Sequence, residues 1–514
     1  MKYPIGIQTF EEIITGGYVY VDKTELIYKL IDSGKYYFLS RPRRFGKSLL
    51  TTTLEAYFQG RKELFRGLAI EKLEKEWVQH PVFHLDFSAA DYTDSTALDN
   101  RLELTISDWE GKYGKNNGEK NFGERFYGVV NRAKEQTKQK VVLLIDEYDK
   151  PLTDTIGMPE IQDRNRAMLQ GLYGIMKRAD SSIRFAFLTG VTRYGKLGIF
   201  SAANNPEDIS MVRDYTSICG ITDAELHNVF DAEVMEFANV LNVTKNEMYE
   251  LLKRKYDGYH FCAGSEDVYN PFSLLNALKN KSLDNKWFAT GTPIYLAKML
   301  KNSNSDLTKF QNDVVAVAES MASFGNGDSN LIAALYQGGY LTIKGYDGRR
   351  FYQLGFPNEE VEEGFVQCLL TEYSGNNAVG LDSDMKALRD AIEADDVEGF
   401  MQQIQLIINQ IPFESHEPKL IEANFRNMLY LMMRSAGYQA KIELPVLGGR
   451  IDVFFETDNC AYIIECKRDK TAQEALSQID EKRYAARIST NKRIVKIGAN
   501  FSTVERNLTE WVVG

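Results

Sequence analysis

The sequence predicts a multidomain α/β protein in which a parallel sheet comes first, a mainly helical region follows, and a smaller α/β unit ends the chain. Three observations lead to this prediction. The 514 residues exceed the size of one ordinary domain. Short apolar runs alternate with helical stretches over the first two hundred residues, which is typical of α/β layering. The last hundred residues return to this alternation after the helical interval.

Four β-like runs define the first unit: Lys35–Ser40, Val82–Phe87, Val141–Ile145 and Phe185–Thr189. All but the second are almost continuously apolar, as expected for parallel strands that are covered on both faces. Helical stretches such as Lys47–Phe58 and Asp163–Arg178 separate the strands. We therefore expect a parallel sheet with helices on both sides.

A phosphate-binding loop is predicted where the first strand meets the first of these helices. The segment FLSRPRRFGKSLL contains Gly46-Lys47-Ser48, and it lies between a strand and a helix, as a P-loop requires. Backbone N–H groups at the start of the helix would hold phosphate oxygens. Lys47 would reach the β- and γ-phosphates of ATP, and the Ser48 hydroxyl would bind Mg²⁺. The residues expected at the nucleotide from this loop are Arg43, Arg44, Phe45, Gly46, Lys47, Ser48 and Leu49.

Arg41 stands where the usual P-loop pattern has its first glycine. Glycine eases a tight turn there, so its absence weakens the match. We expect Arg41, Arg43 and Arg44 to add positive charge beside the phosphates. A loop glycine followed by a solvated lysine is the alternative interpretation of the GKS tripeptide on its own.

Polar side chains also end the third and fourth strands. In VVLLIDEYDK, Asp146 is placed to help hold the metal ion, and Glu147 is placed to orient or activate the attacking water. An acidic loop after a buried strand is the alternative, but the order of the two motifs favours a nucleotide site. Thr189 is a candidate γ-phosphate sensor, and Arg193 a candidate for stabilising the transferred phosphoryl group. A strand-capping threonine and a solvated arginine fit these two positions equally well.

These segments, together with YVDKTELI upstream and YNPFSLLNAL downstream, resemble the AAA-ATPase-like family of bacterial P-loop proteins over most of residues 1–300. The resemblance implies a P-loop NTPase core with an additional strand, followed by a helical region, and it implies binding of ATP with Mg²⁺. Arginine at the position of Arg41 looks like a regular feature of that family. The rate of ATP turnover stays open.

The middle region, from Ser217 to Ala394, has a mainly helical pattern. One hairpin interrupts it at residues 339–358, where Asp347-Gly348 is a turn signal between two alternating strands. In NPFSLLNAL, Asn270 is expected to cap a helix and Pro271 to occupy its first turn. We expect a lid or coupling module here, with domains at 1–215, 216–400 and 401–514.

Charged residues interrupt two apolar runs near the C-terminus, in GGRIDVFFETDNCAYIIECKRDK. Alternate residues of a strand share a face, so Glu465 and Lys467 project together. If the runs pair as a hairpin through residues 457–459, Asp452 approaches the same face. Asp452 and Glu465, with the Cys466 carbonyl, would then offer the oxygen ligands that Mg²⁺ prefers, and Lys467 would position water and stabilise charge on phosphorus. The alternative is an ion cluster on an exposed hairpin.

Flanking helices offer further candidates for this site. Glu422 lies on an upstream helix and would add a carboxylate to the metal site. Gln478 and Lys482 lie four residues apart on a helix predicted over Ala472–Arg487. Gln478 is expected to face the metal and Lys482 to contact DNA phosphate, with a solvent-facing polar stripe as the alternative. A strand is expected at Arg493–Gly498.

The segments GGRIDV, IIECK and QIDEKRYA, followed by IVKIGANF, resemble the PD-(D/E)XK nuclease superfamily in order and spacing over about the last hundred residues. The resemblance implies a restriction-endonuclease-like α/β domain that cleaves phosphodiesters with Mg²⁺ or Mn²⁺. All three core side chains, Asp452, Glu465 and Lys467, are present.

Composition narrows the class of protein. A net charge of −11 argues against indiscriminate coating of nucleic acid. No apolar run is long enough to span a bilayer, and no secretory signal is visible, so we expect a cytoplasmic protein that does not use a membrane. Five scattered cysteines without CxxC spacing favour reduced thiols over disulfides or zinc.

The sequence as a whole predicts an ATP-regulated, metal-dependent nuclease that acts on nucleic acid, with DNA the expected substrate. A nucleotide-switched regulator that binds nucleic acid or protein without cleavage is the alternative. A small-molecule kinase would leave the C-terminal charged trio unexplained. The oligomeric state and the identity of any arginine finger are left open, and a homo-oligomer fits the sequence.

Overall fold

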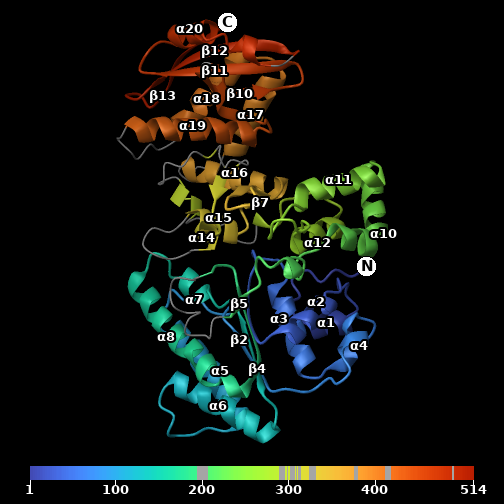
Figure 1. Ribbon diagram of the computed structural model, residues 1–514. Helices are drawn as coiled ribbons and strands as arrows, with labels where there is room; N and C mark the ends of the chain where they lie inside the picture. Colours follow the sequence, from blue (N-terminus) through green and yellow to red (C-terminus); the bar gives the residue numbers. More distant parts are fainter. Residues whose placement is uncertain are drawn as a thin grey trace. The chain divides into compact units, whose positions relative to one another are not determined.

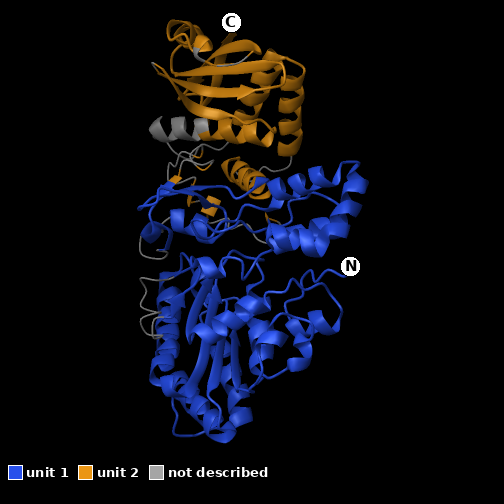
Figure 2. Ribbon diagram, turned by 45° about the vertical axis from the view of Figure 1, so that its right-hand side comes forward, with its two compact units in different colours: residues 1–287, 315–359 blue, residues 288–314, 360–514 orange. Residues whose placement is uncertain are grey.

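The computed structural model describes residues 1–193, 206–288, 296–297, 299–300, 307, 310, 314–322, 331–374, 380–410, 418–447, 449–488 and 491–514, with only the backbone at 418–424, 426 and 487. The chain forms two compact units (Figures 1 and 2). The first contains residues 1–287 and 315–359, and the second contains residues 288–314 and 360–514. The α/β multidomain class predicted from the sequence is confirmed. The three predicted domain boundaries stay a prediction.

The first unit is built on a five-stranded parallel sheet with the strand order β2-β3-β4-β1-β5. Its strands are β1 (Tyr36–Ser40), β2 (Val82–Asp86), β3 (Val141–Asp146), β4 (Ile183–Gly190) and β5 (Glu207–Asp208). Strand β4 lies between β1 and β3, in the place of the additional strand that the family resemblance implies. Every residue of β3 is buried, because helices cover both faces of the sheet.

Helices α1–α4 lie on one side of this sheet and α5–α8 on the other (Figure 1). They are α1 (Phe10–Thr15), α2 (Thr24–Ser33), α3 (Lys47–Phe58), α4 (Ile70–Leu73), α5 (Ala97–Tyr113), α6 (Phe122–Thr137), α7 (Lys150–Thr153) and α8 (Pro159–Arg178). Helix α3 packs against β2, β3 and β4, and α6 packs against β3. The loop between β1 and α3 therefore opens at the carboxyl edge of the sheet, where ligands of such folds bind.

The rest of the first unit is mainly helical, as predicted. It contains α10 (Asp223–Leu241), α11 (Lys245–Tyr256), α12 (Pro271–Asn280), α14 (Ala318–Ala322) and α15 (Leu331–Gln337). Asn270 caps α12 by accepting hydrogen bonds from two backbone N–H groups, and Pro271 is in the first turn, so this prediction is confirmed. The predicted hairpin is also present, as β7 (Thr342–Tyr346) and β8 (Tyr352–Gly355), and β6 (Val314–Ala316) extends it to three strands.

The second unit contains a five-stranded mixed sheet with the order β13-β12-β11-β10-β9. Its strands are β9 (Lys441–Val446), β10 (Gly449–Glu456), β11 (Cys460–Arg468), β12 (Arg493–Ser502) and β13 (Asn507–Val513). Strands β11 and β12 are parallel, and the other neighbours are antiparallel. The hairpin predicted through residues 457–459 is confirmed by the pairing of β10 with β11.

Helix α20 (Ala472–Glu481) packs on β11, β12 and β13, and α18 (Val397–Asn409) packs on β13. Figure 1 shows α20 on one side of this sheet and α17–α19 on the other. The remaining helices are α16 (Glu359–Tyr373), α17 (Leu381–Glu393) and α19 (Pro418–Ser435). Helix α20 ends six residues before its predicted end at Arg487, because Arg483 takes the left-handed conformation with φ 51°. None of the helices among the described residues has both the length and the apolar character needed to cross a membrane.

Candidate nucleotide and metal sites

The loop between β1 and α3 has the backbone of a phosphate-binding loop. Gly46 takes φ 91°, a conformation that side chains disfavour, and Arg44 takes φ 67°. Gly46 is also the N-cap of α3, and no side chain among the described residues caps this helix. The first N–H groups of the helix therefore remain available for an anion. Lys47 is buried and donates to the carbonyl oxygens of Arg41 and Pro42, both at 3.1 Å, which curls the loop around its ammonium group.

Arg41 does not place its charge beside the phosphates, contrary to the expectation above. Its side chain is 1% exposed. The guanidinium donates to the carbonyl oxygens of Ser40 and Ser210 at 2.9 Å and of Tyr215 at 3.1 Å. These bonds direct it into the core behind the loop, while Arg43 and Arg44 are exposed.

Aromatic residues from the middle region surround the same loop. The Phe45 ring is buried, with its centroid 4.7 Å from that of Tyr259 in an edge-to-face contact. The Trp287 indole N–H donates to the Arg43 carbonyl at 3.1 Å. The Arg44 guanidinium lies 5.0 Å from the centroid of Phe272. The conformation of this loop is therefore supported by side chains more than 200 residues away in the sequence.

Carboxylates gather at the carboxyl ends of β2 and β3. Asp146 is 3% exposed and lies beside Asp86 in the strand register. Burial raises the pKa of Asp146, and the hydrogen bond from Ser48 and the charge of Lys47 oppose that rise. The structure thus brings Lys47, Ser48 and Asp146 together, as predicted for a magnesium and phosphate site.

Glu147 follows with φ 50°, and its backbone N–H donates to the Asp146 carboxylate at 3.0 Å. Burial raises the pKa of Glu147, the charge of Lys47 opposes this, and the carboxylates of Asp146, Asp149 and Asp86 add to it. A carboxylate with a raised pKa, held beside the phosphate loop, has the character of a general base.

Asp149, which follows β3, is hydrogen-bonded to the segment that follows β4. Its carboxylate accepts hydrogen bonds from the Thr192 N–H and the Thr192 hydroxyl, both at 2.6 Å. Gly190 makes this approach possible, because a Cβ there would lie 2.3 Å from the Asp149 carboxylate. Thr189 is fully buried, and its hydroxyl has no hydrogen-bond partner within the described part of the chain. An unsatisfied hydroxyl at this strand end suits the sensor role proposed for Thr189.

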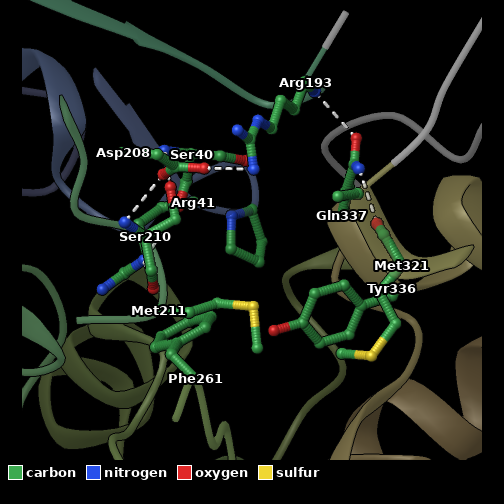
Figure 3. Close-up of a pocket in the computed structure, with 12 residues that line it drawn as sticks. Ser40, Arg41, Arg193, Asp208, Ser210, Met211, Phe261, Met321, Tyr336 and Gln337 are labelled. Carbon is green, nitrogen blue, oxygen red and sulfur yellow. Dashed lines mark hydrogen bonds and ion pairs between the residues drawn. The ribbon is translucent and has the colours of Figure 1, made fainter. Parts of the chain in front are cut away.

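Arg193 is held at both ends (Figure 3). Its backbone N–H donates to the Gln337 side chain at 2.8 Å, and its guanidinium pairs with Asp208 at 2.7 Å. These residues border a cavity of about 50 Å³. Its lining also includes Ser40, Arg41, Pro42, Ser210, Met211, Phe261, Met321, Ala322 and Tyr336. In this arrangement the Arg193 guanidinium is occupied by its ion pair with Asp208.

Two carboxylates meet across the β10–β11 hairpin in the second unit. The pairing of Val453 with Ile464 places Asp452 next to Glu465 when the register is continued by one residue. Asp452 accepts a hydrogen bond of 2.7 Å from the Cys466 backbone N–H. Cys466 is half-buried, and burial raises the pKa of its thiol. The two carboxylates therefore share one face of the hairpin, as the alternation of the strands predicts.

Glu465 is 2% exposed in spite of its charge. Burial and, next, the negative charge of Asp452 raise the pKa of Glu465 to about 8, and Lys467 acts in the opposite direction. Its Oε2 atom finds no hydrogen-bond partner among the residues that the structure describes. A buried carboxylate oxygen without a partner costs free energy unless a proton or a cation occupies it.

Gln478 of α20 bridges the two other side chains of this site. Its Oε1 atom accepts from the Lys467 ammonium, and its Nε2 atom donates to Glu465. The Lys467 nitrogen lies 3.7 Å from the nearer Glu465 oxygen. Helix α20 therefore fixes the lysine and the glutamate relative to each other. Gln478 lies beside both of them, at the site it was predicted to face.

Comparison with known proteins matches a domain family at each end of the chain. A family model described as predicted AAA-ATPase matches residues 4–200, and a PD-(D/E)XK nuclease superfamily model matches residues 420–511. Over 522 aligned residues the chain is 32% identical to an uncharacterized protein in the vnfD 5′ region of Azotobacter chroococcum mcd 1, and the alignment covers all of this chain and 98% of that protein. The chain belongs to the AAA-ATPase-like family. Its C-terminal domain belongs to the PD-(D/E)XK nuclease superfamily. Proteins with these domains generally use a nucleotide and a divalent metal ion.

The donor sets of this AAA-ATPase-like protein fit hard cations. In the first unit a hydroxyl and a carboxylate, from Ser48 and Asp146, adjoin the phosphate loop, and in the second unit the carboxylates of Asp452 and Glu465 share one face of the hairpin. No group of three or more His, Cys, Asp or Glu side chains in metal-binding geometry occurs over the described residues. Each candidate site thus offers two protein side-chain oxygen donors, the arrangement in which Mg²⁺ keeps waters and substrate oxygens as its other ligands.

The roles predicted for all of these site residues stay predictions, and three residues, Glu422, Lys482 and Leu49, have no part in the contacts described above. The side chain of Glu422 lies outside the described residues, although its backbone belongs to α19. Lys482 is exposed at the C-cap of α20, and its contact with DNA is untested. The Cys466 carbonyl as a metal ligand is likewise untested. Leu49, in the first turn of α3, packs with its side chain against the cluster around Phe65.

Several residues of the AAA-ATPase-like unit were missed from the sequence. Asp86 ends a strand just as Asp146 does, and this shared position was the available signal. Asp149 belongs to the same DEYD segment as Glu147, but its target at Thr192 lies on another loop. Nothing in the sequence signals that Trp287 bonds to the phosphate loop.

Proposed function

We propose that this protein binds and hydrolyses ATP and uses it to control a metal-dependent nuclease that cleaves the phosphodiester bonds of DNA. The observation that carries the proposal is the convergence of Asp452, Glu465, Lys467 and Gln478, in which one buried Glu465 oxygen is without a partner in the described structure. The two domain families support the same pairing of activities.

The nuclease step follows from the side chains. Asp452 and Glu465 would hold Mg²⁺ or Mn²⁺, which when bound supplies a Lewis acid and an activated water. Lys467, held by Gln478, would orient the water and stabilise negative charge that develops on the scissile phosphate. Burial excludes bulk water from Glu465, so its electrostatic effect on the site is strong.

The nucleotide step uses the first unit. The α3 N-terminus and Lys47 would bind the phosphates of ATP, and Ser48 and Asp146 would hold the accompanying Mg²⁺. Glu147 would take the proton of the attacking water, because its environment raises its pKa. Thr189 would contact the γ-phosphate. Arg193 would stabilise the transferred phosphoryl group once its guanidinium has separated from Asp208.

A cleavage assay on the full chain tests the proposal. Supercoiled, linear and single-stranded DNA and single-stranded RNA are incubated with Mg²⁺ or Mn²⁺, with and without ATP. We expect metal-dependent cleavage of DNA that Asp452→Asn abolishes and that Lys47→Ala uncouples from ATP. Asp458→Asn, an exposed aspartate in the turn of the same hairpin, is the control and should cleave as wild type does. Equal cleavage by wild type and Asp452→Asn would overturn the nuclease assignment.

The same assay distinguishes the proposed nuclease from the alternative, a nucleotide-switched regulator that binds nucleic acid or protein without cleaving it. Metal that binds at Asp452 and Glu465 without cleavage of any of these nucleic acids would favour it. As part of the proposal we place the protein in the bacterial cytoplasm, without a membrane role. A homo-oligomer would offer a source for an arginine finger.

A further inference from the structure

The β7–β8 hairpin carries exposed aromatic rings that neither candidate site uses. Tyr346 is 40% exposed and Phe351 is 48% exposed. Across the described residues no other Phe, Tyr or Trp reaches this exposure, and the other exposed large hydrophobic residues are Met, Leu and Val. Aromatic rings are normally buried, so two of them at one hairpin tip indicate an interaction surface.

Two tyrosine rings pack against each other across the hairpin. Tyr346 pairs with Tyr352 in the strand register, and their ring centroids are 4.6 Å apart at an interplanar angle of 30°. Phe351 precedes Tyr352 in the chain, and the Arg350 guanidinium lies 5.9 Å from the centroid of the Phe351 ring. Flat π faces beside a guanidinium are the features on which an unstacked base binds.

The tip is positively charged and preorganised. Residues 344–352 contain three Lys or Arg and one Asp. The carboxylate of that residue, Asp347, accepts hydrogen bonds from the backbone N–H groups of Arg349, Arg350 and Phe351, at 2.8, 2.8 and 3.0 Å. Arg349 and Arg350 are exposed and form no ion pair with any residue of the described ranges. The two arginines are therefore available to an anionic partner while the turn stays fixed.

We infer that this hairpin binds an unpaired stretch of nucleic acid. Bases would stack on Tyr346 and Phe351, and the phosphates would pair with Arg349 and Arg350. Unpaired nucleotides fit better than a duplex, because only unstacked bases offer their faces to a ring. The chain as a whole carries a charge of −11, so the attraction is local to this tip. The inference rests on the proposed function in one respect, the nucleic acid substrate.

Fluorescence anisotropy tests the inference without any cleavage. The full chain is titrated in EDTA against labelled single-stranded DNA, single-stranded RNA and duplex DNA of one length. We expect binding to at least one single strand, weakened about fivefold or more by Tyr346→Ala/Phe351→Ala. Arg349→Ala/Arg350→Ala should reduce the slope of log K against log[salt] by about 1.4, because each lost phosphate contact removes about 0.7. Met235→Ala and Lys62→Ala/Arg66→Ala remove exposed groups elsewhere on the first unit and should bind as wild type does.

The outcomes separate the two claims. Three results would overturn the inference: wild-type binding by both hairpin variants, binding to duplex alone, or no binding of any nucleic acid. Thermal melting of each variant checks that it is folded. Hairpin-dependent binding combined with no cleavage under any metal would sink the proposed nuclease and leave the hairpin's role intact. Cleavage that is normal in both hairpin variants, with unchanged binding, would sink the hairpin's role alone.

Discussion

The guanidinium of Arg41 lies 4.0 Å from the ring centroid of Phe261. Arg41 occupies the place of the first P-loop glycine, yet it is not among the described residues with a left-handed backbone, so glycine is not needed there. The arginine instead fills a buried position between Phe261 and a set of backbone carbonyls. Arg41 therefore connects the phosphate loop to the middle region. The left-handed backbone conformations of the loop are at Arg44 and Gly46.

Replacing Arg41 should destabilise the first unit. Arg41→Ala leaves four carbonyl oxygens without their donor and opens a cavity beside Phe261, which together cost about 2–4 kcal/mol. Differential scanning calorimetry should show a lower transition temperature. Arg41→Lys should recover little, because an ammonium group cannot serve carbonyls spread around a planar guanidinium.

Arg43→Ala is the matched control, since Arg43 is exposed in the same loop. Its transition temperature should equal that of the wild type. Equal stability of Arg41→Ala and wild type would show that the buried arginine does not hold the loop to its neighbours.

The arrangement of the side chains at the candidate nuclease site could be predicted from the sequence because it depends on local rules. Asp452, Glu465 and Lys467 belong to one hairpin, and strand alternation alone brings them to one face. The contact between Arg41 and Phe261 could not be predicted, because it depends on how two distant segments pack. The same holds for Asp149 and Thr192, whose hydrogen bonds cross from one strand end to another. For this reason the expectation that Arg41 places its charge beside the phosphates was wrong.

Glu147→Gln should separate ATP hydrolysis from ATP binding. The amide cannot accept the proton of water, so kcat should fall about 10²–10⁴-fold. The Kd for ATP should change little, because Lys47 and the α3 N-terminus remain. Stopped-flow phosphate release and nucleotide binding give the two quantities. Glu160→Gln, an exposed glutamate at the start of α8, serves as control; a loss of binding in Glu147→Gln equal to the loss of kcat would rule out the base.

Gln478→Leu should impair cleavage through the orientation of Lys467 and Glu465. Leucine keeps much of the volume but leaves both partners of the amide without their bridge. We expect kcat for DNA cleavage to fall about 10- to 100-fold with little change in KM, since second contacts of this kind orient a site more than they bind substrate. Gln473→Leu, on the exposed side of the same helix, should cleave normally. A change in KM alone would identify Gln478 as a substrate contact.

The raised pKa of Glu465 should make both stability and metal binding depend on pH near neutrality. Its pKa rises from an ordinary 4.5 to about 8 in the folded, metal-free protein. A carboxyl group with a raised folded-state pKa contributes stability that is complete below the unfolded pKa and is lost as the pH rises through the folded pKa. In EDTA, Glu465→Gln should therefore melt at a higher temperature than the wild type at pH 9, and the difference should shrink by several degrees toward pH 5.

Metal binding should follow the opposite course, because a cation must displace the proton of Glu465. The affinity for Mn²⁺ should rise by up to tenfold per pH unit toward pH 8 and level off above it. Titration calorimetry in the Asp146→Asn background isolates this site from the nucleotide site. Asp452→Asn removes the neighbouring charge that raises the pKa of Glu465, so it should bind Mn²⁺ more weakly and with its pH dependence moved to lower pH. An affinity that is flat from pH 6 to pH 9 would mean that Glu465 is already ionised, and that its unpaired oxygen is solvated by a route other than a cation.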